Sequence, residues 1–432
     1  MPLIDFLREL EWRDMVAERT AGLPARLVDR RPLAAYVGFD PSFPSLHAGH
    51  LVPIFALGHL QRAGGRPVAL IGGGTGMIGD PSGRSSERNL LDEPTIDANA
   101  AAIREQLSRF LDFDAGPRGA LLIDNREWLG RYGLLEFLRE IGKHFTLAYM
   151  LDKESVQLRL PTGISFTEFT YMLLQAADFA HLYRHHGVEM QMGGADQWGN
   201  ITAGLELIRR MEGPAEAGVE RAHALGLRLI TTPSGAKFGK TEGGGNLYLD
   251  ARFTSPFRFY QHWINVDDRD VGLFLHTLTA MSREEIEAIV AEQSARPERR
   301  PAQRALARDI TGRVHGADEA RRQQEIAEAV FGERLASLDP ALLATVFGEM
   351  EHAWLARGAV PATVLDFAVA SGAAASRGEA RRTIAQGGLY LNEQRVGDPD
   401  APVPGPIAGE YWVVRTGRKR YRIVRLSDEA GD

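Results

Sequence analysis

The chain has 432 residues, 44% of them hydrophobic, which is enough for about two to four domains with buried cores. It contains no cysteine, which excludes disulfides and cysteine-based zinc sites, and its net charge of −7 argues against a protein that coats nucleic acid indiscriminately. No apolar run approaches the roughly 18 residues that a membrane span needs. The N-terminus has no signal-peptide pattern, so we expect a cytoplasmic protein with no membrane partner.

The first half of the chain alternates between strand-like and helix-like segments. The first predicted helix begins near Gly49, and the predicted strands lie at residues 33–39, 67–71, 120–123, 188–192 and 227–230. This alternation is typical of parallel βαβ units, and it predicts an α/β fold with a Rossmann-like, doubly wound parallel sheet. Ligands of such sheets bind beyond the carboxyl ends of the strands. We therefore expect chemistry in the glycine-rich breaks that follow these strands.

The second half loses the strand signal. From about residue 255 to 347 the apolar spacing is helical, as in residues 283–290. Residues 361–425 contain ten Arg and Lys against six Asp and Glu, which sets them apart from the acidic remainder. The predicted division is a catalytic domain at 1–250, an α-helical domain at 251–350, a linker at 351–360 and a small α+β domain at 361–432.

Two histidines flank a glycine where the first strand gives way to a helix, in His47-Ala48-Gly49-His50. A helix N-terminus offers unpaired N–H groups and a positive dipole end, both of which favour an anion. Gly49 lets a nucleotide approach the backbone closely. The imidazoles are able to donate to a phosphate whose charge rises in an in-line displacement. The alternatives are two structural histidines at a turn, or a metal pair that no HExxH pattern supports.

A glycine-rich segment, residues 72–84, follows the second predicted strand. Three of its glycines have the GxGxxG spacing of dinucleotide-binding dehydrogenases. That fingerprint must open a helix, whereas the Asp-Pro-Ser-Gly run beginning at Asp80 breaks the chain at once, which argues against a dehydrogenase. Arg84 and Arg88 suit phosphate contacts. The alternative is a surface loop.

Three polar residues share one face of a predicted helix over residues 165–180. Tyr171, Gln175 and Asp178 are spaced at i, i+4 and i+7, and their neighbours are mostly apolar. Groups that can bind an ammonium or a hydroxyl suit an amino-acid pocket. The alternative is a polar stripe that faces solvent.

Two later loops carry further candidates. Residues 191–200 end a strand with two glycines, after which Asp196 either caps a helix or accepts hydrogen bonds from ribose hydroxyls. Residues 237–241, Lys-Phe-Gly-Lys-Thr, place two lysines in a glycine-rich loop. Such lysines can follow pyrophosphate as it leaves, and would then act most strongly in the transition state. The alternative is a solvated basic turn.

Taken together, these segments closely resemble the bacterial tyrosyl-tRNA synthetases, which are class I aminoacyl-tRNA synthetases, over residues 33–425. His47-Ala48-Gly49-His50 is similar to the first family signature, HIGH in its common form, and residues 237–241 to the second, KMSKS. Residues 79–83 and 193–200 are also similar to stretches of that family. Two positions depart from the family pattern: Arg84 stands where a lysine is expected, and Ser42 where a threonine is expected.

The resemblance implies a tyrosine–tRNA ligase that activates tyrosine with ATP, forming tyrosyl-adenylate and pyrophosphate, and then transfers tyrosine to the 3′ end of tRNA(Tyr). ATP is expected as its Mg²⁺ complex, with no tightly bound metal. The enzyme is expected to be a homodimer with the apolar Tyr132–Met150 region at its interface. The helical domain would lie on the anticodon side, and the C-terminal domain resembles an S-four-like RNA-binding domain.

By position, the resemblance also assigns the site residues. The tyrosine pocket comprises Tyr36 and Asp178 at the phenol, Asp80, Tyr171 and Gln175 at the ammonium, and Gln191 and Gln197. The nucleotide site comprises Gly38, Asp40, Ser42, His47, Gly49, His50, Gly193, Asp196, Leu229, Ile230, Lys237 and Lys240. The catalytic groups are His47, His50, Lys237, Lys240, Thr241, Arg84 and Arg88. The RNA-binding residues are Arg377, Arg381, Arg382, Arg418, Lys419 and Arg420, for which the alternative is a solvated surface.

Two other readings of the whole chain stay open. A tryptophanyl enzyme shares the fold and both signatures, but it would need an indole pocket in place of the Tyr36 and Asp178 pair. A synthetase-like RNA-binding protein with an idle catalytic centre is the second, against which the intact signatures count.

Overall fold

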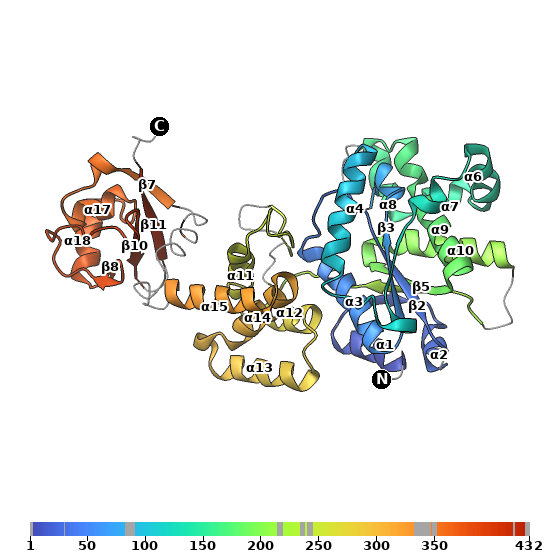
Figure 1. The fold of residues 1–432 in the computed structure, drawn as a ribbon, viewed down its shortest axis with the longest axis horizontal. Coiled ribbons are helices and arrows are strands. Elements are labelled where there is room, and N and C mark those ends of the chain that lie inside the picture. The colour runs from blue at the N-terminus through green and yellow to red at the C-terminus, as the bar shows by residue number, and fades with distance from the viewer. Residues whose placement is uncertain are drawn as a thin grey trace. The chain divides into compact units, whose positions relative to one another are not determined.

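The computed structural model describes residues 3–29, 31–82, 91–213, 219–233, 238–239, 245–331, 347, 352–417 and 420–427. The chain separates into two compact units, which are described here one at a time. The first comprises Met1–Ser255 with His262–Ala317, and the second comprises Pro256–Gln261 with Asp318–Asp432. Figure 1 labels the elements of both units.

A six-stranded sheet forms the centre of the first unit, with the strand order β1-β6-β5-β2-β3-β4. All neighbouring strands pair in parallel except β1, which is antiparallel to β6 at the edge. The strands are β1 (Val16–Arg19), β2 (Ala34–Phe39), β3 (Arg66–Ile71), β4 (Leu121–Asp124), β5 (Val188–Gly194) and β6 (His223–Leu227). The chain leaves β2 toward β3 on one side and returns to β5 on the other, so the strand order reverses there. This confirms the Rossmann-like parallel sheet.

The prediction of a strand at residues 227–230 is wrong. β6 ends at Leu227, where its pairing with both β5 and β1 stops. The backbone N–H of Arg228 instead donates to the carbonyl oxygen of Met15 at 2.8 Å. The strand therefore begins four residues earlier than predicted, at His223, and Leu229 and Ile230 lie beyond the sheet.

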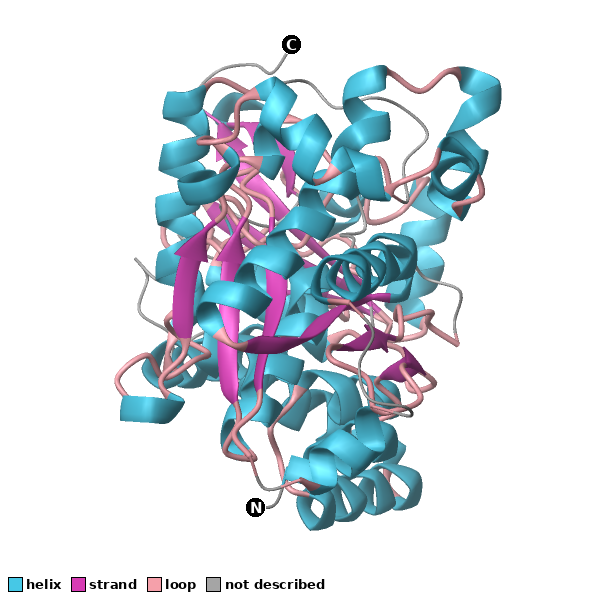
Figure 2. Cartoon of the chain, turned by 90° about the vertical axis from the view of Figure 1, so that its right-hand side faces the viewer, coloured by secondary structure: helices cyan, strands magenta, loops and turns pink. Residues whose placement is uncertain are grey.

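Helices cover both faces of this sheet. In Figure 1, α3 and α4 lie on one side of the strands and α9 and α10 on the other, and Figure 2 shows the strands as magenta arrows among them. The helices are α1 (Leu3–Trp12), α2 (Leu23–Val28), α3 (Leu51–Arg62), α4 (Glu93–Leu107), α5 (Arg126–Leu129), α6 (Leu134–Glu140), α7 (Leu147–Leu151), α8 (Glu154–Arg159), α9 (Phe166–His186) and α10 (Trp198–Glu212).

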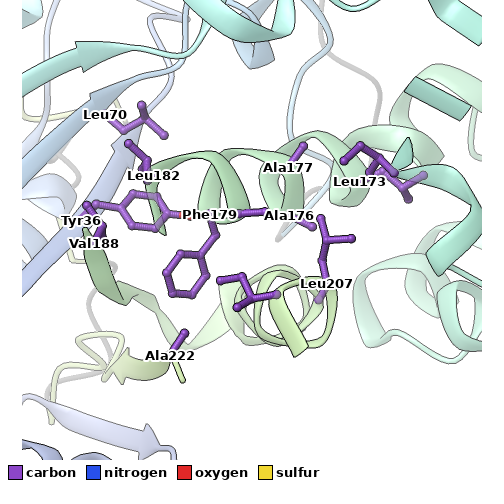
Figure 3. Close-up of a cluster of buried hydrophobic side chains, with 14 of the residues drawn as sticks. Tyr36, Leu70, Leu173, Ala176, Ala177, Phe179, Leu182, Val188, Leu207 and Ala222 are labelled. Atoms are coloured by element: carbon purple, nitrogen blue, oxygen red, sulfur yellow. The ribbon is translucent and has the colours of Figure 1, made fainter. Parts of the chain in front are cut away.

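Helix α9 supplies much of the buried core. Ser165 caps its first turn by accepting from the N–H of Glu168, and Gly187 ends it in the left-handed conformation at φ 64°. The core cluster in Figure 3 brings Tyr36 of β2 against Phe179 of α9, with ring centroids 5.4 Å apart. A side chain at Gly204 of α10 would place Cβ 2.9 Å from Phe179, so the close packing of α9 and α10 requires glycine there.

The helix-rich stretch expected from residue 255 onward consists of α11 (Pro256–Ile264), α12 (Val271–Leu278), α13 (Arg283–Ala295), α14 (Pro301–His315) and α15 (Ala317–Phe331). Within the first unit, the buried Arg13 at the end of α1 ties the N-terminus to α12. Its guanidinium donates to the carbonyl oxygens of His276, Thr279 and Met281 at 2.6 to 2.9 Å. No described helix is long and apolar enough to cross a membrane.

The second unit carries a five-stranded sheet with the strand order β7-β11-β10-β8-β9. Its elements are β7 (His352–Ala356), α17 (Val364–Ala370), α18 (Arg377–Ala385), β8 (Leu389–Leu391), β9 (Gln394–Arg395), β10 (Tyr411–Thr416) and β11 (Arg420–Ser427). The predicted linker at 351–360 is wrong for residues 352–356, because β7 pairs in parallel with β11 along its whole length. The other predicted domain boundaries stay predictions.

Candidate active site

A cavity of about 1380 Å³ opens beside the carboxyl ends of β2, β5 and β6. This is the point at which the strand order reverses, where open α/β sheets bind their ligands. The described residues of both predicted sites all line it: Tyr36, Gly38, Asp40, Ser42, His47, Gly49, His50, Asp80, Tyr171, Gln175, Asp178, Gln191, Gly193, Asp196, Gln197, Leu229 and Ile230. The fold thus gathers residues from positions 36 to 230 around one space.

One end of the cavity combines a buried hydroxyl with a buried carboxylate. Tyr36 and Asp178 are 1% and 2% exposed, and among the described residues neither the Tyr36 hydroxyl nor the Gln191 side-chain oxygen has a hydrogen-bond partner. Buried polar groups are normally satisfied, so two unpartnered ones lining the same cavity indicate that a polar ligand completes them.

Asp178 is held by two donors that sequence reasoning missed. The side-chain amide of Asn125 donates to its Oδ2 at 2.9 Å, and the indole Nε1 of Trp128 donates to its Oδ1 at 2.8 Å. Burial raises the pKa of Asp178 to about 8, and these two hydrogen bonds oppose that rise. Burial, with the nearby Asp178 charge, also raises the pKa of Tyr36 well above 10. Tyr36 is therefore a neutral hydroxyl.

A second set of carboxylates lies at the middle of the cavity. The Tyr171 hydroxyl donates to Oδ2 of Asp40 at 2.8 Å, and the Thr75 hydroxyl donates to Oδ1 of the same carboxylate at 2.8 Å. Gln197 donates to Oδ2 of Asp80 at 2.7 Å. Two oriented carboxylates in one cavity create a negative field, which suits an ammonium group.

The two histidines lie at the entry to α3, on a single 3-10 turn (Ala48–His50). The N–H of Gly49 donates to Nδ1 of His47, and the N–H of His47 donates to Nδ1 of His50, both at 3.1 Å. Because both Nδ1 atoms accept, the hydrogen-bond network assigns the proton of each neutral ring to Nε2. A Cβ at position 49 would lie 2.8 Å from the His47 ring, so the tight turn requires Gly49.

The two signature segments touch through their backbones. The N–H of Ala48 donates to the carbonyl oxygen of Leu247 at 2.8 Å, and the N–H of Leu247 donates to that of Gly239 at 2.9 Å. His47 and Tyr248 form an isolated antiparallel bridge. Arg84, Arg88, Lys237, Lys240 and Thr241 lie outside the described residues.

The remaining residues of the predicted nucleotide site also line the cavity. A Cβ at Gly38 would meet no atom within 4 Å, so that position borders open space. Burial, and next the charge of Asp80, raise the pKa of Asp196. Leu229 is 50% exposed and offers an apolar surface beside the glycines that end β5.

Among the missed residues, Asn125 had a usable signal. It directly follows β4, at a strand end where ligands bind in this class of fold. Trp128 and Thr75 had none, because their role depends on which side chains the fold brings against them. Phe43 and Tyr248 also line the cavity, with stacked rings 4.6 Å apart.

In the second unit, α18 presents the predicted basic residues to solvent. Arg377, Arg381 and Arg382 are exposed, and Arg377 pairs with Asp366 at 3.1 Å. The guanidinium of Arg415 lies 3.6 Å from the ring centre of Tyr390 on the neighbouring strand. Arg418 and Lys419 lie outside the described residues, and Arg420 is the first residue of β11.

No three His, Asp or Glu residues of the described part of the chain converge as metal ligands. The cavity therefore offers a surface of hydroxyls, amides, imidazoles and single carboxylates. Such a surface can orient an amino acid and a nucleotide and can stabilise charge on a phosphate.

Comparison with known proteins gives the same picture. Residues 28–332 match the family described as tRNA synthetases class I (W and Y), and residues 343–424 match the Tyrosine--tRNA ligase SYY-like C-terminal domain. The Tyrosine--tRNA ligase of Anaeromyxobacter dehalogenans is 48% identical over 428 residues, covering 98% of this chain and 99% of that protein. That of Geobacillus stearothermophilus is 45% identical over 428 residues, covering 98% and 100%.

Among solved structures, a C-terminally truncated mitochondrial tyrosyl-tRNA synthetase of Aspergillus nidulans superposes with a TM-score of 0.68. The two sequences are 29% identical, and the match covers 76% of this chain and 94% of that one. Both family matches and the near-complete coverage agree with the cavity described above. The chain belongs to the tyrosine–tRNA ligase family of class I aminoacyl-tRNA synthetases.

Proposed function

We propose that this chain activates tyrosine with ATP, giving tyrosyl-adenylate and pyrophosphate, and then transfers the tyrosyl group to the 3′ end of tRNA(Tyr). The observation that carries the proposal is a single cavity lined both by the unpartnered Tyr36 hydroxyl with Asp178 and by the two histidines of the first signature. The enzyme needs no covalent intermediate. Positioning and electrostatic stabilisation of the reacting groups are enough for this chemistry.

The substrate phenol would bind between Tyr36 and Asp178. Its O–H would donate to the Asp178 carboxylate, and the Tyr36 hydroxyl, which has no described protein partner, would donate to the phenol oxygen. Phenylalanine would leave the Tyr36 hydroxyl buried and unpaired, at a cost of about 1–3 kcal/mol, while Asp178 would keep only its bonds to Asn125 and Trp128. This difference favours tyrosine over phenylalanine.

The substrate ammonium would lie against Asp80, Tyr171 and Gln175, and its carboxylate near Gln197. Asp196 and Gly193 would contact the ribose, while Leu229 and Ile230 would lie against adenine. Gly38 and Asp40 would border the nucleotide, with Ser42 within reach of its phosphates. Gln191 completes the pocket, and its unpartnered side-chain oxygen supports a ligand there.

The α-phosphate would be stabilised by His47 and His50, whose Nε2–H groups are its donors. The β- and γ-phosphates would be held by Lys237, Lys240, Thr241, Arg84 and Arg88. Mg²⁺ would enter with ATP as part of the substrate, because this ion usually stays on phosphates and keeps several waters. The carboxylate of tyrosine would attack the α-phosphorus, with pyrophosphate leaving in line.

Two features support the proposed partners. The exposed arginines of α18, with Arg418, Lys419 and Arg420, would bind phosphates of tRNA, and salt would weaken that binding. The exposed leucines of the Tyr132–Met150 region, Leu134, Leu135, Leu138 and Leu147, support a homodimer through that region, and Leu151 and Leu158 are exposed just beyond it. We also propose a cytoplasmic location, where ATP and tRNA occur together.

The test is tyrosine-dependent ATP–pyrophosphate exchange without tRNA, with phenylalanine and tryptophan measured alongside. We expect exchange with tyrosine alone. Exchange with tryptophan would move the specificity to the indole-binding relatives while keeping the fold. Failure of a folded protein with all three amino acids, in the presence of Mg²⁺, would refute the proposed activity.

A further inference from the structure

The segment that carries the histidines has little regular structure of its own to fix it. Between the end of β2 at Phe39 and the turn at Ala48, the chain forms neither helix nor strand apart from an isolated bridge. The position of this segment relative to the cavity therefore depends on its contacts with other elements. One side chain that contacts three consecutive residues of this segment is Gln106, near the end of α4, about 60 positions further along the chain.

Gln106 satisfies the backbone directly in front of His47. Its Oε1 accepts from the N–H of Leu46 at 2.9 Å and lies 3.4 Å from the hydroxyl oxygen of Ser45, whose proton is donated to the carbonyl oxygen of Leu46 at 2.7 Å. Its Nε2 donates to the carbonyl oxygens of Ala102 at 3.2 Å and Pro44 at 3.5 Å. Gln106, Ser45 and Leu46 are 5%, 4% and 1% exposed, so water cannot readily replace this amide.

Two of these residues, Ser45 and Leu46, also bond to the segment that follows the second signature. The Ser45 hydroxyl accepts from the N–H of Asp250 at 3.1 Å, and the carbonyl oxygen of Leu46 accepts from the N–H of Leu249 at 2.9 Å. Asp250 and Leu249 follow directly on the segment that binds Gly239. One buried amide thus fixes the backbone at which the two phosphate-handling segments meet.

We propose that Gln106 is a positioning residue for the first step of the reaction: through Leu46 and Ser45 it sets the position of the His47 and His50 imidazoles. This inference rests on the proposed role of those histidines. Gln106 is not among the residues that line the cavity. Its contribution comes from orientation, and a displacement of about 1 Å in a catalytic group can lower a rate by about a hundredfold.

The tyrosine end of the cavity does not depend on this amide. Asp178 is held by Asn125 and Trp128, and Tyr36 lies within β2. Loss of the Gln106 amide should therefore lower the rate of tyrosine activation and leave tyrosine binding alone. A purely structural role would instead change both quantities, or neither.

The first variant is Gln106→Met, which keeps the volume of the side chain and removes its strong acceptor. The expected result is a fall of about ten- to a hundredfold in the kcat of pyrophosphate exchange, with KM for tyrosine unchanged. Unchanged kcat in a folded protein would overturn the proposal, as would an equal loss in tyrosine affinity. Ser45→Ala is the milder companion, expected to lower kcat in the same direction, and it keeps the test decisive if Gln106→Met does not fold.

Gln293→Met is the matched control. Gln293 is also a buried helical glutamine, which accepts from the N–H of Ala302 at 3.3 Å and donates to Asp268 at 3.1 Å. It lies on α13 and does not line the cavity. Its loss should lower the melting temperature by a similar amount while kcat stays at the wild-type value. A comparable fall in kcat would show that the effect of Gln106→Met reflects general loosening, and would overturn the proposal.

A double-mutant cycle with His50→Asn distinguishes positioning of the histidines by Gln106 from a general loosening of the protein. Asparagine keeps an acceptor for the N–H of His47 and removes the donor at Nε2. If Gln106 acts through the histidines, Gln106→Met should lower kcat in the wild-type background and lower it by a smaller factor in the His50→Asn background, where only His47 remains to be positioned. Fully additive effects would overturn the positioning role. A His50→Asn enzyme with unchanged kcat would refute the proposed role of the histidine itself.

Discussion

At the scale of single residues, the end of the cavity that contains Tyr36 and Asp178 combines groups that are costly in the free protein. The Tyr36 hydroxyl is buried without a described partner, and Asp178 is a buried carboxyl group. Both costs would be relieved when a phenol binds between them. The groups that favour substrate binding at these two positions therefore lower the stability of the free protein, which makes them the most informative places to substitute.

Tyr36→Phe should separate the two effects. Removing an unpartnered buried hydroxyl should leave the free energy of unfolding unchanged or raise it by about 1 kcal/mol. The same change should raise KM for tyrosine roughly tenfold, because one hydrogen bond to the phenol is lost. Thermal unfolding and pyrophosphate exchange measure the two quantities. A loss of stability together with an unchanged KM would contradict the placement of the phenol.

Asp178 predicts a pH dependence. Its pKa is raised from 3.8 to about 8, so the carboxyl is mostly protonated at pH 7 and mostly ionised at pH 9. A substrate phenol that donates to the ionised form should bind about tenfold more tightly at pH 9 than at pH 7, in proportion to the ionised fraction. Equilibrium binding of tyrosine across this range measures the effect.

Asp178→Asn is the control for that profile, because an amide does not titrate. Its NH₂ group would also face either Asn125 or Trp128, both of which are donors, so overall affinity should fall. If the variant keeps the wild-type pH profile, the profile belongs to the amino group of the substrate and the assignment to Asp178 fails.

At the scale of elements, the sequence predicted the strands that carry the site better than the contacts that support it. The polar stripe of α9 was visible from spacing alone, as was the glycine-rich end of β5. Gln106 was not, because a glutamine on a helix is usually solvated. Only the fold shows that it lies buried beside Leu46. The assignment of particular roles came from the resemblance to a family and stays a prediction.

Two other differences have simple causes. β1 is an edge strand of four residues with exposed side chains, so no apolar pattern marks it. β7 was read as a linker because its parallel partner, β11, lies some 70 residues further along the chain. Long-range pairing of short strands leaves no local signal in either segment.

The pairing of β7 changes how the C-terminal domain should be removed. A chain that ends at residue 360 keeps β7 without β11 and exposes an unpaired strand, which favours aggregation. A chain that ends before His352 avoids this. We expect the shorter chain to keep pyrophosphate exchange within about twofold, because the residues that line the cavity all lie in the first unit, and to lose most tRNA aminoacylation. Full aminoacylation by that chain would contradict the proposed RNA-binding role.

At the scale of the whole molecule, the exposed leucines form the strongest argument for a homodimer. Leu135 is 81% exposed and Leu134 is 73% exposed on α6, an unusual density of bare apolar side chains. Such a surface is stable in water when a second copy covers it.

Leu135→Glu should therefore shift the protein toward monomers in sedimentation equilibrium, because a buried interfacial charge without a partner is costly. Val28→Glu is the matched control, since Val28 is 67% exposed on α2, away from that surface. A dimer that is equally weakened by both changes would contradict an interface through α6. A protein that is monomeric before any change would contradict the homodimer itself.

The strand order has a consequence for how the protein is made. One neighbour of β2 in the sheet, β3, follows it closely in the sequence, but the other, β5, follows only after roughly 150 residues. During synthesis on the ribosome, one edge of β2 therefore stays unpaired for roughly 10 to 30 s. The unpaired edge is the backbone of Ala34–Phe39, which borders the proposed substrate site once the domain has folded. Nascent chains of intermediate length should therefore be the ones that chaperones hold, and tyrosine cannot protect them, since Gln191 and Gln197 of its proposed pocket have yet to be translated.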